Sequence, residues 1–487
     1  MNILFASSEA HPLIKTGGLA DVCGSLPRAL KNAHQDVRLV LPAYPAAISR
    51  AGKLTLTGTI DLPGASTPVR LLQGQLPGTR VKLYLIDAPH HFDRNGNPYT
   101  NAKGKGWPDN AARFALFARA ICALALNQAG LDWQPDLVHC NDWQTGLVPA
   151  LLAQTQQRPA TVFTIHNLAY QGLFNHKTFE SLGLPADWWS LDKLEFHRQL
   201  SFIKGGLVYA DWLTTVSPTY AREICTPTFG CGLQGLLAHR QDTLTGILNG
   251  ADYQIWSPGK DKLLPQTYTA RTLEGKQVNK RALQKAFGLP ELTDTPLLGH
   301  VGRLVGQKGL DLVLTLIPTL IKRQLQLVIL GTGDAELESS LREAADAYPQ
   351  QIAVRIEYDE SLSHLLEAGS DIFLMPSRFE PCGLNQIYSL RYGTPPVVRQ
   401  TGGLADTVTD STGFSFDKIS ATALLKAIDR ALASYADADT WQQLQQKGMS
   451  ADFSWSRSAK MYLELYRQVL ERRQTAPSLD QMGRMSV

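Results

Sequence analysis

The chain has 487 residues, which is too many for one hydrophobic core, so we expect at least two domains. Its 47 basic and 44 acidic residues leave a formal net charge of +3, which excludes a general attraction to nucleic acid or to an anionic membrane. Six cysteines form no CxxC pair, so we expect neither a zinc site nor a disulfide framework, but reduced thiols in a cytoplasmic protein. No apolar run approaches the roughly 18 residues of a membrane span, and the N-terminal run lacks the features of a signal peptide.

The first half of the chain alternates short apolar runs with helical stretches. It opens with a predicted strand at 2–6, a glycine-containing loop, a helix at 19–31 and a strand at 37–41. Apolar and helical stretches continue at 81–86, 114–126, 137–139, 161–165 and 212–216. This alternation is typical of βαβ units and predicts a parallel sheet covered on both faces.

The same pattern starts again at residue 296. Strands are predicted at 296–302, 325–330, 354–357, 372–375 and 396–398, with helices at 310–322 and 335–347. Between the two patterns, a stretch rich in glycine and proline predicts a hinge at 245–257. The fold class is therefore α/β, with two Rossmann-like domains at 1–245 and 246–455 that face a central cleft. Ligands of such sheets bind at the loops that follow the strands.

The loop KTGGLAD, residues 15–21, follows the first strand and opens a helix. Its paired glycines allow a ligand to approach the backbone, the helix start favours an anion, and Lys15 adds a positive charge. A tight turn with a solvated lysine is the alternative. The hexapeptide TGGLAD recurs at 401–406, which is too short to show duplication but indicates that the same helix start is used twice.

The loop GRLVGQKG, residues 302–309, joins a predicted strand to an apolar helix. A guanidinium at Arg303 and an ammonium at Lys308 in one such loop suit a diphosphate, although the spacing is not that of a P-loop. Ordinary surface cations are the alternative. The GTG at 331–333 lacks the third glycine of a dinucleotide fingerprint and is interpreted as a packed turn.

Two further loops carry candidate side chains. In SRFEPCGL, residues 377–384, Glu380 could bind sugar hydroxyls beside the helix-opening amides of Cys382 and Gly383, or it could simply favour the helix start. In HNLAYQG, residues 166–172, His166 leads a loop rich in hydrogen-bonding side chains. Asp142 and the tryptophan after it, at another strand end, suit a sugar ring, but a buried tryptophan with a capping aspartate would look the same.

In this order and spacing, KTGGLAD, HNLAYQG, GRLVGQKGLDL and SRFEPCGL resemble the family of bacterial glycogen synthases and plant starch synthases. Supporting segments are DAPHHFDRNGNPY, DNAARFALF, VSPTYAREI, ILNGAD and DFSW, so the resemblance extends from residue 1 to about residue 466. It implies a retaining GT-B glycosyltransferase that transfers glucose from ADP-glucose to an α-1,4-glucan, with glycogen or a malto-oligosaccharide as primer. It also implies a C-terminal helix at 456–472 that crosses back to the N-terminal domain, and we expect a loose tail at 473–487.

The resemblance assigns roles residue by residue. Lys15, Arg303 and Lys308 would hold the diphosphate, with the amide of Gly18. His166, Asp142 and Asn249 would contact or position the glucose, and Glu380 would bind its hydroxyls with the amides of Cys382 and Gly383. Asp21 and Tyr358 would lie on the nucleoside side.

We expect no metal and no cofactor, because the three cations can stabilise the departing ADP. The clearest Asp-x-Asp pair, at 437 and 439, is interpreted as a solvated turn. No carboxylate is a convincing nucleophilic partner to Glu380, which favours front-face transfer. UDP-glucose as donor, a sugar-nucleotide epimerase of the same fold and a glucan-binding protein remain open alternatives, and so does the oligomeric state.

Overall fold

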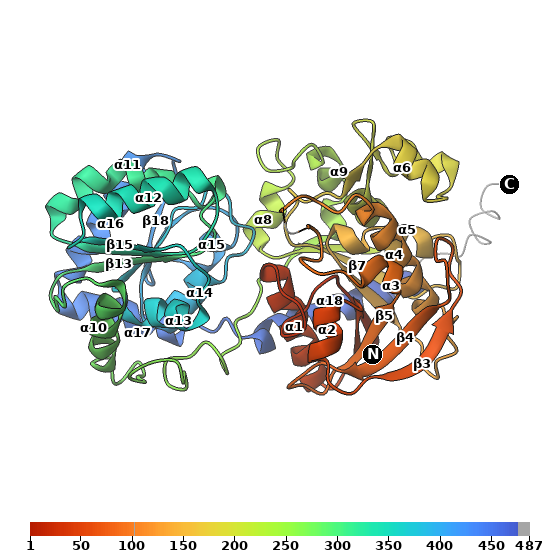
Figure 1. Cartoon of the computed structure of the whole chain (residues 1–487), viewed down its shortest axis with the longest axis horizontal. Coiled ribbons are helices and arrows are strands. Elements are labelled where there is room, and N and C mark those ends of the chain that lie inside the picture. The colour runs from red at the N-terminus through yellow and green to blue at the C-terminus, as the bar shows by residue number, and fades with distance from the viewer. Residues whose placement is uncertain (102, 476–487) are drawn as a thin grey trace. The chain divides into compact units, whose positions relative to one another are not determined.

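The computed structural model describes residues 1–101 and 103–475, and these fold into two units (Figure 1). The first unit comprises Met1–Val216, Ala221–Ile247 and the chain from Trp455 onward. The second comprises Ser217–Tyr220 and Leu248–Ser454. None of the described helices is both long and apolar enough to cross a membrane.

A nine-stranded sheet forms the centre of the first unit. Its strands are β1 (Asn2–Ala6), β2 (Asp36–Pro42), β3 (Thr55–Ile60), β4 (Val69–Gln75), β5 (Lys82–Asp87), β6 (Leu137–Asn141), β7 (Ala160–Ile165), β11 (Trp212–Thr215) and β12 (Leu244–Gly246). They lie in the order β12-β11-β7-β6-β1-β2-β5-β4-β3. All neighbours are parallel except β5 with β4 and β4 with β3, so the predicted parallel sheet carries an unpredicted antiparallel edge. Burial explains the difference, because β1 is almost fully buried and β6 is fully buried, whereas most of β3 is exposed or half-buried.

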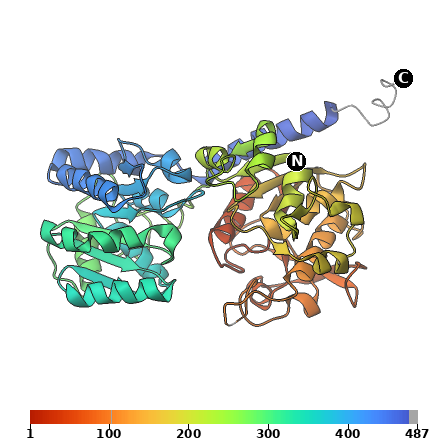
Figure 2. The same ribbon diagram turned by 90° about the horizontal axis from the view of Figure 1, so that it is seen from above.

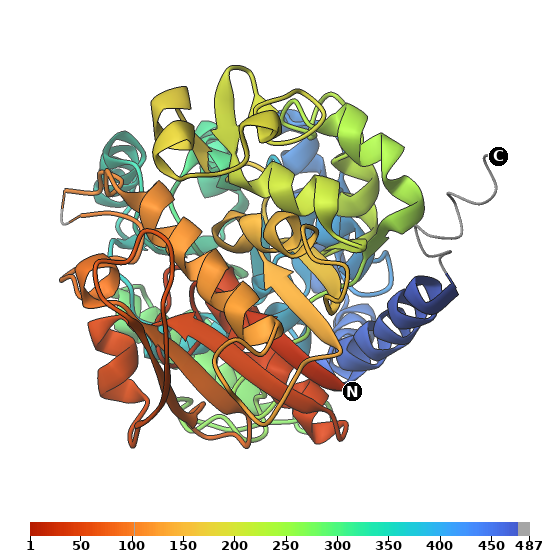
Figure 3. The same ribbon diagram turned by 90° about the vertical axis from the view of Figure 1, so that its right-hand side faces the viewer.

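Helices cover both faces of this sheet (Figures 2 and 3). The helices along this part of the chain are α1 (Gly18–Asn32), α2 (Pro45–Arg50), α3 (Pro89–Phe92), α4 (Asn110–Ala125), α5 (Leu147–Leu152), α6 (His176–Ser181), α7 (Phe202–Tyr209), α8 (Pro218–Glu223), of which Pro218–Tyr220 belong to the second unit, and α9 (Gln234–His239). A small antiparallel sheet is built from β8 (Leu173–Phe174), β10 (Gln199–Ser201) and β9 (Glu195–Phe196).

The C-terminal helix α18 (Trp455–Thr475) belongs to the first unit and packs against α1 and β7 (Figure 1). Tyr466 holds it in place, because its hydroxyl lies 2.6 Å from Nδ1 of the buried His139 on β6. The helix extends to Thr475, so the prediction of a loose chain from 473 is wrong for its first three residues. The rest of that predicted tail, 476–487, lies outside the described residues.

The second unit is a parallel sheet in the order β15-β14-β13-β16-β17-β18. Its strands are β13 (Leu297–Val301), β14 (Gln326–Leu330), β15 (Ile352–Arg355), β16 (Ile372–Met375), β17 (Pro396–Arg399) and β18 (Phe414–Phe416). Its helices are α10 (Gly275–Phe287), α11 (Leu310–Leu320), α12 (Ala335–Ala347), α13 (Glu360–Gly369), α14 (Asn385–Arg391), α15 (Gly402–Thr407), α16 (Ala421–Tyr435) and α17 (Ala438–Ser450).

Side chains of these strands alternate between two apolar layers. Leu327 and Ile329 of β14 join one layer, whereas Val328 and Leu330 join the other. This period of two places a hydrophobic core on each face of the sheet and requires helices on both sides.

Most of the predicted hinge is packed structure. The ring of Trp256 stacks on His364 at 3.8 Å and on Tyr388 at 4.0 Å between ring centres, all within the second unit. The amide of Ala251 donates to the carbonyl of Phe453 at 2.7 Å. Glycine and proline content suggested a mobile linker, but these contacts tie residues 251–257 to the second unit.

Candidate functional site

Each sheet has a point where the strand order reverses, and the predicted site residues follow the strands at these points. In the first unit, β1 lies between β2 and β6, and the loops after β1 and β6 carry Lys15 and Asp142. In the second, β13 lies between β14 and β16, and the following loops carry Lys308 and Glu380. Such switch points are where open α/β sheets bind ligands.

The Lys15 loop presents an open helix start. Helix α1 begins at Gly18, and its N-cap Gly17 provides no side-chain hydrogen bond to the first amides of the helix. A Cβ added at Gly17 or Gly18 would meet no atom within 4 Å, which shows that internal packing does not require these glycines. Lys15 Nζ lies 2.8 Å from the carboxylate of Asp21, so the structure brings these two predicted residues together.

Glu9, which the sequence reasoning did not select, holds this loop. Its buried carboxylate accepts hydrogen bonds from the amide of Thr16 at 2.6 Å and from the hydroxyl of Tyr99 at 2.7 Å. Burial raises the pKa of Glu9 although these hydrogen bonds oppose the shift. A carboxylate three residues after the predicted strand at 2–6 is a signal in the sequence that could have selected Glu9.

Asp142 and His166 are connected through the backbone. Oδ1 of Asp142 accepts from the amide of His166 at 2.8 Å, and Nε2 of His166 lies 2.9 Å from Oδ1 of Asn141. Asp142 has a φ of 57° and a ψ of 179°, a strained conformation for a residue other than glycine, and such strain concentrates at functional sites.

The protonation of this pair follows from burial. Burial raises the pKa of the Asp142 carboxyl to about 7 and lowers the pKa of His166 to about 3. His166 is therefore neutral at neutral pH, whereas Asp142 is partly ionised.

Trp143 is half-buried, and its ring packs within an aromatic cluster. Its ring packs edge-on to Phe114 at 5.0 Å and to Phe202 at 6.1 Å. A Cβ at Gly172 would collide with it. The contacts favour the buried-tryptophan alternative over a sugar platform.

In the second unit, Lys308 and Glu380 form a shielded ion pair. Lys308 Nζ lies 2.6 Å from Oε2 of Glu380, and the two side chains are 15% and 9% exposed. The hydroxyl of Ser377 donates to the same oxygen at 3.0 Å. The structure thus places a cation and a carboxylate side by side at the switch point.

Arg303 lies on the surface of the same loop. Its Nη2 lies 3.4 Å from Oε1 of Gln307, a weak contact, so its guanidinium is available to a ligand. Gln307 in turn donates from Nε2 to the carbonyl of Phe379 at 3.0 Å, which joins the two loops after β13 and β16.

Asn249, Cys382 and Gly383 form one neighbourhood beside Glu380. Asn249 is 6% exposed, and its Oδ1 is buried with no hydrogen-bond partner among the described residues. The backbone N–H of Asn249 donates to the thiol of Cys382. Burial raises the pKa of this thiol to about 12, so it stays protonated and unreactive at neutral pH. Gly383 has a φ of 71°, and a Cβ there would collide with Gln386. An unsatisfied buried amide oxygen is a group that a ligand can satisfy.

Tyr358, the remaining predicted residue, is 74% exposed and stands directly before the cap of α13. Its hydroxyl lies 3.4 Å from Oε2 of Glu360. The structure places the ring at the carboxyl end of β15, two strands away from β13 in the sheet.

The Asp-x-Asp pair has a structural role. Asp437 caps α17, where its side chain accepts from the amides of Asp439 and Thr440. Both carboxylates are exposed at the turn between α16 and α17, so the interpretation as a solvated turn agrees with the structure, and the cap adds a structural role. Within residues 1–101 and 103–475, no group of three or more His, Cys, Asp or Glu side chains is arranged to hold a metal ion.

Comparison with known proteins adds sequence and fold relatives. Residues 2–239 match the family described as "Starch synthase catalytic domain", and residues 284–448 match "Glycosyl transferases group 1". The chain is 58% identical to a glycogen synthase of Thioalkalivibrio sulfidiphilus, over 96% of this chain and 100% of that one. It is 55% identical to glycogen synthase 2 of Nitrosococcus oceani, over 96% and 97% of the two chains.

Among solved structures, the chain is similar to the catalytic domain of starch synthase IV from Arabidopsis thaliana, determined with bound ADP and acarbose. The TM-score is 0.86 at 32% identity, and the match covers 96% of this chain and 99% of that one.

Proposed function

Because the chain belongs to the family of bacterial glycogen synthases, we propose that it transfers glucose from ADP-glucose to the non-reducing end of an α-1,4-glucan, with retention of configuration. The predicted family and the predicted two-domain α/β fold of GT-B glycosyltransferases are confirmed, and the chain is a glycosyltransferase. The proposed acceptor is glycogen or a malto-oligosaccharide primer. The proposed donor is supported by the ADP bound in the related starch synthase.

The observation that carries the proposal is the Lys308–Glu380 pair at the switch point of the second sheet. A nucleotide sugar needs a cation for its diphosphate next to a hydrogen-bond acceptor for its sugar hydroxyls, and this pair supplies both. When the donor binds, the Lys308 ammonium group donates hydrogen bonds to the diphosphate as well as to Glu380. Arg303 adds a second cation from the same loop.

The first unit is proposed to bind the diphosphate through Lys15 and the amide of Gly18. The open space around Gly17 and Gly18 supports this role, because a phosphate can approach the amides at the start of α1 directly. Asp21, bonded to Lys15, and the exposed ring of Tyr358 are proposed on the nucleoside side.

The remaining predicted residues are proposed to bind the transferred glucose. In the second unit, Glu380 accepts from its hydroxyls while the amides of Cys382 and Gly383 donate. The unsatisfied Oδ1 of Asn249 is available to a further hydroxyl. In the first unit, Asp142 and His166 contact the sugar.

We propose that the reaction proceeds on one face of the sugar. The bond between the anomeric carbon and the phosphate oxygen breaks, the acceptor oxygen bonds to that carbon from the same side, and the departing phosphate takes the acceptor's proton. Arg303, Lys308 and Lys15 stabilise the charge that develops on ADP, without a metal ion. The neutral state of His166 supports this scheme, because an imidazolium would repel an oxocarbenium-like centre.

No cofactor beyond the substrates is part of this proposal, and cytoplasm is the proposed compartment. The six cysteines are unpaired in the structure, which suits a reducing compartment.

The test is incorporation of labelled glucose into glycogen, with ADP-glucose and UDP-glucose compared side by side, each with and without EDTA. We expect primer-dependent transfer from ADP-glucose that EDTA does not reduce. Preference for UDP-glucose would refute the donor assignment, and loss with EDTA would refute the metal-free scheme. Conversion of the nucleotide sugar without a primer would indicate an epimerase.

A further inference from the structure

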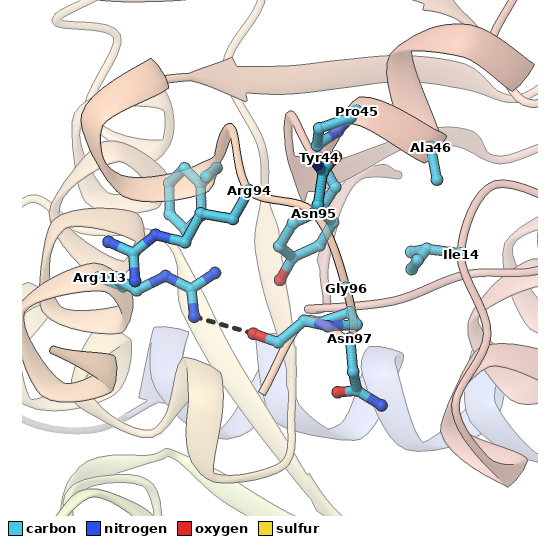
Figure 4. A pocket seen from close by; sticks show the side chains of 11 residues that line it. Ile14, Tyr44, Pro45, Ala46, Arg94, Asn95, Gly96, Asn97 and Arg113 are labelled. Carbon is cyan, nitrogen blue, oxygen red and sulfur yellow. Dashed lines mark hydrogen bonds between the residues drawn. The ribbon is translucent and has the colours of Figure 1, made fainter. Parts of the chain in front are cut away.

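A cavity of about 220 Å³ lies in the first unit, and none of the predicted site residues lines it (Figure 4). Its walls come from the segment after β2, from the loop after α3 and from α4. They include Ile14, Tyr44, Phe92, Arg94, Asn97 and Arg113. Ile14 lines it but Lys15 does not, so the cavity adjoins the proposed diphosphate loop without being part of it. At about 30 Å³ per water, it has room for roughly seven waters or one small ligand.

Arg113 is a buried guanidinium without a counterion. It is 1% exposed, and its three bonded N–H groups reach only neutral acceptors. Nε donates to the carbonyl of His91 at 2.7 Å, and Nη1 donates to the carbonyl of Pro98 at 2.8 Å and to Oδ1 of Asn110 at 2.7 Å. Among the described residues, no acceptor bonds its Nη2 and no carboxylate pairs with it, and burial lowers its pKa.

The hydroxyl of Tyr44 points into the same space (Figure 4). Tyr44 is 4% exposed, and its buried hydroxyl has no hydrogen-bond partner among the described residues. Its ring is fixed edge-on to Phe92 at 5.8 Å. A buried hydroxyl held rigidly without a partner costs stability unless a ligand completes it.

Arg94, the second arginine that lines the cavity, adds no net positive charge to it. Both Nη atoms of Arg94 bond the carboxylate of Asp109, so this pair is neutral together. Arg113 therefore has no ion pair of its own. The rings of Phe92 and Phe114 face its guanidinium at 5.5 Å, and Asp109 acts on it without a direct contact. Arg113 and Tyr44 both line the cavity, and the unbonded donors at Arg113 Nη2 and the Tyr44 hydroxyl are available to a ligand there.

We propose that this cavity is a binding site for a small oxyanion, namely a phosphate group, which Arg113 Nη2 and the Tyr44 hydroxyl hold by charge-assisted hydrogen bonds. A guanidinium suits the tetrahedral oxygens of phosphate, and desolvated donors of this kind bind anions more strongly than surface lysines do. The source is free orthophosphate or the phosphoryl group of a hexose monophosphate, which share this chemistry.

The experiment is calorimetric titration of the whole chain with potassium phosphate at constant ionic strength, with potassium chloride as the reference. We expect saturable phosphate binding at this cavity that is separate from binding at the proposed donor site. Tyr44→Phe removes only an unpartnered hydroxyl, so the variant should fold at least as stably as the parent while its phosphate affinity falls about tenfold or more. Arg113→Lys should also weaken binding at least tenfold, because the planar fork is lost.

Two controls separate this site from others. Arg119→Lys alters another half-buried guanidinium of α4, which bonds the carbonyls of Pro63 and Leu182, and should leave the phosphate affinity unchanged. Lys308→Gln should also leave it unchanged, because Lys308 belongs to the proposed donor site. Absence of saturable binding, or binding that Lys308→Gln abolishes and Tyr44→Phe leaves intact, would overturn the proposal.

The same titration with a hexose monophosphate distinguishes the sources. Tighter binding than orthophosphate that still depends on Tyr44 supports a phosphorylated sugar as the ligand. Equal or weaker binding supports free phosphate.

Discussion

Replacing Asp142 with asparagine should stabilise the protein at alkaline pH. The Asp142 carboxyl is 7% exposed, and burial raises its pKa from 3.8 to about 7. At about 1.36 kcal/mol per pKa unit, ionised Asp142 then destabilises the fold by about 4 kcal/mol at pH 8. Asparagine retains an oxygen for the amide of His166, carries no charge and tolerates the positive φ.

The sign of the pH dependence is determined by the raised pKa. Below about pH 3.8 the carboxyl is protonated in both the folded and unfolded states, so Asp142 costs nothing. As pH rises to about 7, the unfolded state ionises first and the stability of the parent falls. The advantage of Asp142→Asn should thus grow by about 3 kcal/mol between pH 5 and pH 8.

The assay is urea denaturation of both proteins across that pH range, together with glucosyl transfer at neutral pH. Asp211→Asn is the matched control. Burial alone would raise the pKa of Asp211, but Arg158 and Thr161 bond its carboxylate and hold that pKa below its usual value. Asp211→Asn should therefore destabilise the protein at neutral pH. A pH-independent effect of Asp142→Asn, or destabilisation at pH 8, would refute the reasoning. Transfer should fall although stability rises, because the proposed contact with glucose changes.

Three further predictions concern single contacts. Lys308→Gln should lower kcat with the donor by about 10²–10³ in a steady-state assay, as expected for loss of a group that stabilises developing charge, and an unchanged kcat would return Lys308 to a purely structural role. Gly403→Ala should lower the melting temperature of the second unit, because the added Cβ would collide with the carbonyl of Cys382. Gly18→Ala should leave the melting temperature unchanged and raise the KM for the donor, because its Cβ would meet no atom. Equal effects of the two variants on the melting temperature would contradict this distinction. Tyr466→Phe should cost about 1–3 kcal/mol of stability in urea, because Nδ1 of the buried His139 loses its partner, and a neutral result would indicate that this hydrogen bond does not anchor α18.

Periodicity and loop composition were sufficient to predict most of the strands near the site. The strand at 2–6 and the strand at 372–375 were predicted with the bounds that the structure shows, because fully buried parallel strands are continuous apolar runs. Since parallel strands end at one edge of a sheet, the candidates after them were expected to lie at that edge. Lys308 and Glu380 were predicted as site residues on two such loops, but their ion pair was not predicted.

Partly exposed and irregular segments were not predictable in this way. The strands β3 and β4 were missed because one face of this antiparallel edge is solvated and its apolar pattern is weak. Trp256 lies in a stretch rich in glycine and proline that suggests a linker. Its stacking on His364 depends on a residue more than a hundred positions away, which no local pattern reveals.

The repeated hexapeptide TGGLAD shows which structural features can be predicted from the sequence and which cannot. The sequence determined that both copies begin a helix, because the glycine pair and the apolar residues after it act locally, and the structure has α1 and α15 there. Only the tertiary structure decided what each glycine pair does. Gly17 and Gly18 border open space, whereas Gly402 and Gly403 pack against the backbone of Glu380 and Cys382. The backbone conformations open to a glycine depend on the glycine itself and can be predicted from the sequence. The atoms that pack where a side chain would lie come from residues far away in the sequence, so only the folded chain shows them.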